Sequence, residues 1–146
     1  MQQIKQDLKS LCTAAGVGGQ QEITQIATEL LRPLVDEVQT DAMGNVLGFR
    51  YSHTADAPTV MLEAHLDEIG FIIMDATEDG LLIFRPVGGI DPRVCVSKYV
   101  VIGEKKVKGV IGAMAIHLQS AEDRRRVLPF DGLYIDIGAK SKDEAL

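Results

Sequence analysis

A histidine and a carboxylate that could bind and orient a metal ion lie near the middle of the 146-residue chain, at His65 and Asp67. They follow the apolar run Val60-Met61-Leu62, which is typical of a strand buried on both faces. Residues two apart in an extended backbone point to the same face, so the imidazole and the carboxylate can converge. The carboxylate can accept the proton of one ring nitrogen, which fixes the tautomer and makes the other nitrogen a better ligand for a zinc-type metal.

The same pair also has a purely structural interpretation, in which a strand-end histidine bonds to its neighbour and holds no metal. Zinc normally takes at least three protein ligands, more than this pair supplies. His53 lies in a polar loop and is expected to be solvated, whereas His117 is expected to form a hydrogen bond within a loop. A self-contained site made by His65, Asp67 and His117 is a further alternative, which the spacing alone leaves open.

The composition is that of a soluble globular protein, with 46% hydrophobic and 25% charged residues. No apolar run approaches the ~20 residues that cross a bilayer, and the first residues lack a secretory signal. Cys12 and Cys95 form no Cys-x-x-Cys motif and are predicted to be reduced, buried thiols of a cytoplasmic protein. The net charge of −6 argues against nonspecific nucleic-acid binding.

Hydrophobic periodicity in the first half predicts two helices, separated by the glycine-rich residues 16–19, and then short strands. Pro33 should end the second helix near Leu31 because it lacks an amide proton. The predicted elements are helices at 4–15 and from about Gln21 to Leu31, and strands at 38–40, 46–51 and 60–62. This order predicts the beginning of a layered α/β domain over residues 1–70.

After Gly70 the pattern changes to short strands joined by glycine-rich turns, without a convincing helix. Strands are predicted at 71–74, 81–84, 99–102, 107–111 and 133–137. They predict a small barrel or sandwich over residues 71–140, able to fold by itself. The Arg-rich stretch 119–131 is expected to be a mobile surface loop, and phosphate binding by Arg124, Arg125 and Arg126 is an alternative.

The end of the chain carries a helix-start signal, because Ser141 and Glu144 fit a capping box. Residues 141–146 are therefore predicted to begin a helix, and the sequence stops at Leu146 within its first turn. A helix that short is not stable alone. A frayed polar tail is the alternative.

Several segments, in order, resemble the N-terminal part of the cytoplasmic dinuclear-zinc aminopeptidases. That family includes the glutamyl aminopeptidases and the tetrahedral (TET) peptidases, some formerly labelled endoglucanases. The most diagnostic segment is Ala64-His65-Leu66-Asp67-Glu68-Ile69-Gly70-Phe71. The others are Gly16-Val17-x-Gly19, Asp41-x-x-Gly44-Asn45, Gly88-Gly89, Gly109-Val110-Ile111-Gly112, His117-Leu118, and Tyr134-Ile135-Asp136-Ile137-Gly138-Ala139 followed by Ser141-Lys142.

The resemblance implies an α/β fold (α+β in the part present), with residues 1–70 beginning a catalytic domain and residues 71–140 forming a barrel-like β-rich insert that mediates dimerisation. It implies that His65 is a metal ligand and that Asp67 is the catalytic-site residue that orients it. Family members use two divalent metal ions, zinc or cobalt, to hydrolyse N-terminal residues from peptides. Their dimers assemble into large hollow particles, so self-association is expected.

The family's bridging aspartate, Glu-Glu pair and remaining ligands match positions beyond Leu146. This chain alone is therefore expected to be inactive and to bind no metal tightly. Gly18 stands where many members have serine, which weakens the helix cap. The alternative function is a naturally short, non-catalytic protein that self-associates through its β-rich half. No nucleic-acid or membrane partner is expected in either case.

Overall fold

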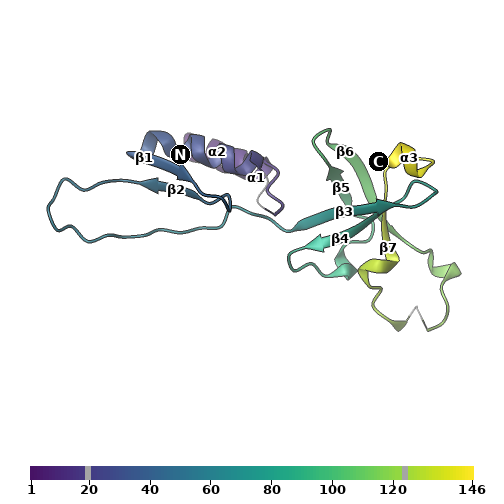
Figure 1. The fold of residues 1–146 in the computed structure, drawn as a ribbon. Coiled ribbons are helices and arrows are strands. Elements are labelled where there is room, and N and C mark those ends of the chain that lie inside the picture. The colour runs from purple at the N-terminus through teal and green to yellow at the C-terminus, as the bar shows by residue number, and fades with distance from the viewer. Residues whose placement is uncertain (19–20, 123–124) are drawn as a thin grey trace. The chain divides into compact units, whose positions relative to one another are not determined.

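The computed structural model describes residues 1–18, 21–122 and 125–146, and its helices and strands are shown in Figure 1. The chain divides into two compact units, Met1–Glu68 and Ile69–Leu146. The division falls beside Gly70, where the sequence pattern changes. Helices occur mainly in the first unit and strands mainly in the second, so the predicted mixed fold class is confirmed.

The first unit begins with two helices, α1 (Gln2–Thr13) and α2 (Gln21–Leu31), both at the predicted places. On α2, the side chains of Ile23 and Ala27 are buried and form the inner face of the helix. A 3-10 turn at Arg32–Leu34 contains Pro33 and ends the helix where the sequence predicts. The antiparallel strands β1 (Glu37–Thr40) and β2 (Val46–Phe49) then form a two-stranded sheet.

The predicted strand at Val60-Met61-Leu62 is wrong. Residues 50–67 contain no helix or strand, and these three side chains are 78%, 78% and 92% exposed. A strand needs a neighbouring backbone, and none of the described residues makes a backbone hydrogen bond to this run. The apolar composition makes burial favourable, but it does not supply the strands that would bury the run.

The two cysteines differ from each other, so one prediction is confirmed and the other is wrong. Cys95 is 3% exposed in the core of the second unit. Cys12 is exposed, and no residue of α1 is fully buried, although this helix contacts α2. Ile4 and Leu8 on that helix are 70% and 59% exposed.

The second unit is a five-stranded antiparallel sheet in the order β3-β4-β7-β6-β5. Its strands are β3 (Gly70–Ala76), β4 (Leu82–Val87), β5 (Tyr99–Ile102), β6 (Val107–Ala113) and β7 (Leu133–Asp136). All five lie where the sequence predicts them, within a few residues at their ends. Leu82, Phe84, Ile111 and Ile135 form the centre of the core, and none is more than 2% exposed.

The turn between β3 and β4 contains the predicted Asp-Gly pair and packs closely on the loop before the last helix. Gly80 has φ +84°, and a Cβ added there would lie 2.6 Å from the backbone oxygen of Ala139. Glycine is therefore required both by the backbone conformation and by this close approach.

The last residues form the short helix α3 (Lys142–Ala145), so the predicted helix start is confirmed. The Ser141 Oγ accepts a hydrogen bond from the Glu144 amide at 3.3 Å, and Glu144 Oε2 accepts one from the Lys140 amide at 2.8 Å. These are the two halves of a capping arrangement.

Two sequence predictions lie partly outside the described residues, since they involve Gly19 and Arg124. Arg125 and Arg126 are exposed, as expected of a surface loop, and Arg126 pairs with Glu122. Phosphate binding by these arginines stays a prediction. Among the described residues, no helix has the length and apolarity needed to cross a membrane.

Candidate functional site

The structure brings His65 and Asp67 together at the end of the extended segment. The Nδ1 atom of His65 lies 3.0 Å from the backbone oxygen of Asp67 and 3.4 Å from its carboxylate Oδ1. Because both neighbours are acceptors, the tautomer of the neutral imidazole that suits this arrangement carries its proton on Nδ1. In that tautomer Nε2 has the lone pair that a metal ion requires.

The pair is open to solvent, since the side chains of His65 and Asp67 are 87% and 63% exposed. One accessible ring nitrogen suits the role of a single ligand within a larger metal site, with Asp67 in the supporting role. It does not make a zinc site by itself, because zinc takes about three protein ligands.

The alternative site made by His65, Asp67 and His117 stays a prediction, because His117 belongs to the second unit and the other two residues belong to the first. Within each unit, the described residues contain no group of three or more His, Cys, Asp or Glu side chains that could hold a metal ion. His117 lies exposed in a 3-10 turn at Ile116–Leu118, and His53 is exposed in its loop as expected.

The segment that carries the pair is attached to the turn after α1. The Glu68 amide donates a hydrogen bond to the backbone oxygen of Gly16 at 3.1 Å, and the Gly16 amide donates one to Glu68 Oε1, also at 3.1 Å. Val17 and Glu68 form an isolated parallel bridge at the same place. Glu68 is not among the residues for which the sequence predicts a role, although a carboxylate directly after His-x-Asp was the available signal.

The motif Asp41-x-x-Gly44-Asn45 is a structural turn between β1 and β2. The Asp41 carboxylate accepts hydrogen bonds from the amides of Met43 and Asn45, at 2.8 and 2.9 Å, and from the Asn45 side chain at 2.8 Å. The bonds from Asn45 hold the pKa of Asp41 below its ordinary value. Since Gly44 has φ +86°, this part of the motif is explained by backbone geometry.

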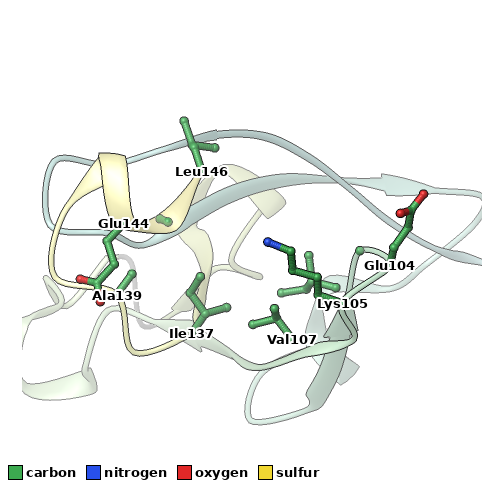
Figure 2. Close-up of a pocket in the computed structure, with 10 residues that line it drawn as sticks. Glu104, Lys105, Val107, Ile137, Ala139, Glu144 and Leu146 are labelled. Atoms are coloured by element: carbon green, nitrogen blue, oxygen red, sulfur yellow. The ribbon is translucent and has the colours of Figure 1, made fainter.

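An open hollow of about 580 Å³ in the second unit is lined in part by Ile102, Val107 and Ile137. Figure 2 shows Lys105 extending over it, with Glu144 on the α3 side. The described residues that line it include no histidine, cysteine or serine. The hollow therefore offers apolar surface and the charged side chains of Glu104, Lys105 and Glu144, but no imidazole of the kind found at His65.

Comparison with known proteins defines the class. Residues 44–146 match the M42 glutamyl aminopeptidase family, and the chain belongs to this family. The family resemblance inferred from the sequence is thus confirmed. The chain is 31% identical over 143 residues to the lysyl aminopeptidase of Pyrococcus furiosus. This matched region covers 94% of the present chain and 40% of the P. furiosus protein.

Solved structures show the same fold. The TET aminopeptidase of the marine sediment archaeon Thaumarchaeota archaeon SCGC AB-539-E09 is similar to this chain with a TM-score of 0.87 and 31% sequence identity. The similar region covers 99% of this chain and 40% of the length of that aminopeptidase. The TET1 peptidase of Pyrococcus horikoshii, which can assemble into a tetrahedron or a large octahedral shell, matches 97% of this chain and 42% of its own, with a TM-score of 0.68 and 38% identity. The chain therefore spans about 40% of the length of these relatives.

Proposed function

We propose that this chain belongs to a metal-dependent aminopeptidase that removes N-terminal residues from peptides, and that it provides one metal ligand. The family membership supports the reaction class, and the accessible Nε2 of His65 supports the ligand role. His65 would bind one of two divalent metal ions, zinc or cobalt, while Asp67 accepts the Nδ1 proton and holds the ring. When bound, such ions polarise a carbonyl and activate a water.

The 146-residue chain alone is proposed to be inactive and to hold no metal tightly. The described residues supply a single histidine nitrogen to such a site, whereas a catalytic zinc needs about three protein ligands and an open position. We also place the protein in the cytoplasm, as the family resemblance implies.

The test compares this chain with the product of its complete encoding reading frame. If that frame extends beyond Leu146, the longer protein should cleave an aminoacyl-anilide only with added zinc or cobalt. His65→Ala should abolish this activity, and the matched change His53→Ala should leave it unchanged. Activity that survives His65→Ala would refute the ligand role. Tight stoichiometric zinc in the 146-residue chain would refute its proposed incompleteness.

We propose in addition that the second unit self-associates. Strands β3 and β5 are the outer strands of the described sheet, and such edges offer unpaired backbone groups to another chain. They also carry exposed apolar side chains, with Ile72 53%, Met74 59%, Tyr99 85% and Val101 65% exposed. A non-catalytic protein that pairs through this unit is the second candidate function, and a reading frame ending at Leu146 would favour it.

Light scattering tests the self-association. We expect a dimer or larger assembly at tens of micromolar, and we expect Tyr99→Glu to weaken it because the change places a charge on the exposed edge. A clean monomer for the unsubstituted chain would refute the proposal.

A further inference from the structure

We infer that Glu68 is a positioning residue for His65 and Asp67, and that it acts through the backbone of Gly16. The inference rests on the proposed metal-ligand role of His65 and adds the contact that fixes where this ligand lies. The contact itself is formed entirely within the first unit and requires no metal.

In the described chain, the backbone hydrogen bonds that tie residues 52–68 to the helical part of the first unit are made at Glu68. From Ser52 to Asp67, no backbone hydrogen bond joins this segment to a helix or strand of the unit. The first attachment is the pair of 3.1 Å bonds between Glu68 and Gly16, which are 52 positions apart. His65 and Asp67 directly precede this point, so their position depends on it.

The two bonds use different parts of Glu68, and together they restrict both the position and the orientation of its backbone. The backbone amide of Glu68 donates to Gly16, while its carboxylate accepts from Gly16. An ionised acceptor gives a stronger hydrogen bond than a neutral one. Together, the bonds fix both the place and the rotation of the backbone at residue 68.

Gly16 restricts the same segment from the other side. It is buried, and a Cβ added to it would lie 3.3 Å from the backbone oxygen of Leu66 and 3.5 Å from Cγ2 of Ile23. The missing side chain therefore lets the backbone directly after His65 lie against the turn between α1 and α2. A substitution at either Gly16 or Glu68 should disturb the same segment.

The experiment uses the metal-free, ¹⁵N-labelled 146-residue chain. In Glu68→Ala, amide exchange at Gly16 should accelerate about tenfold or more, since a bond to a charged acceptor is lost. The heteronuclear NOE of His65 and Asp67 should fall to that of residues 60–62. Glu68→Gln retains an acceptor oxygen and should restore both measurements most of the way, whereas Gly16→Ala should lower the NOE like Glu68→Ala.

Glu63→Ala is the matched control, because it removes an exposed carboxylate from the same segment, and it should change neither measurement. Retention of the Ile23 methyl resonance shows that the helix pair remains folded in each variant. The inference is overturned if Glu68→Ala leaves the NOE of His65 and Asp67 unchanged, even if the melting temperature falls. Because no metal is present, this outcome is independent of whether His65 proves to be a ligand.

Discussion

The strongest test of the second unit is the removal of Phe84 from its core. This side chain is 1% exposed and stacks edge-to-face against Phe71 and Phe130, with ring centroids 4.9 and 6.0 Å away. Phe84→Ala should destabilise the unit by about 3–5 kcal/mol, the usual range for a buried phenylalanine. The expected loss lies toward the upper end, because each aromatic contact adds about 0.5–1.5 kcal/mol beyond burial.

That loss is large compared with the stability available. A unit of roughly 80 residues, here Ile69–Leu146, is expected to be stable by about 4–12 kcal/mol. Phe84→Ala should therefore remove at least a quarter of this stability and could leave little folded protein. A urea titration followed at the methyl resonances of Ile111 and Ile135 measures the change in the core itself.

Ile83→Ala is the matched control, since Ile83 is the preceding residue on β4 and is 40% exposed. Its loss should stay below about 1 kcal/mol, as for most exposed substitutions. If both variants lost the same stability, or if Ile83→Ala lost more, β4 would present the opposite face to the core. Such a result would refute the register, because a shift of one residue exchanges the two faces of a strand.

Three further predictions follow from single residues. Hydrogen bonding from Arg93 lowers the pKa of Asp91 to about 2. The stabilisation from this ion pair should therefore be complete above about pH 4 and should be lost as the pH falls through about 2. An NMR titration midpoint for Asp91 of about 3.9 would contradict this prediction. Gly80→Ala should cost at least about 1–2 kcal/mol in urea unfolding, because φ is +84° and the added Cβ meets a backbone oxygen, and an unchanged midpoint would refute this contact. A thiol reagent should label Cys12 at once and Cys95 only on unfolding, since burial shields Cys95 and raises its pKa; equal rates would be inconsistent with the fold.

The strands of the second unit could be predicted from sequence because each carries its own signal. On β4, the buried Leu82 and Phe84 alternate with the exposed Ile83, and Gly80 supplies the turn that the hairpin requires. The capping signal at Ser141 is equally local, which explains why even a single turn of helix was predicted.

Features that depend on distant partners could not be predicted in this way. The run Val60-Met61-Leu62 has the composition of a buried strand, but burial requires neighbouring strands, and the described residues provide none. The amphipathic pattern of α1 likewise predicts an inner face without identifying what covers it, and Cys12 was misplaced for that reason.

The candidate site shows the same division between local and long-range information. The approach of His65 to Asp67 follows from their spacing, but the bond between Gly16 and Glu68 joins residues 52 positions apart. No pattern within either segment indicates the other one, and only the folded chain shows that they meet.

The position of β7 has a consequence for the order in which the second unit can be made. This strand is the last of the five in the chain, but it lies in the middle of the sheet, between β4 and β6. During synthesis, the hairpins β3-β4 and β5-β6 can each form from local contacts, but they cannot be joined until residues 133–136 have emerged. Until then, each hairpin exposes the strand edge that β7 will cover, and at this stage the growing chain should be most prone to aggregation.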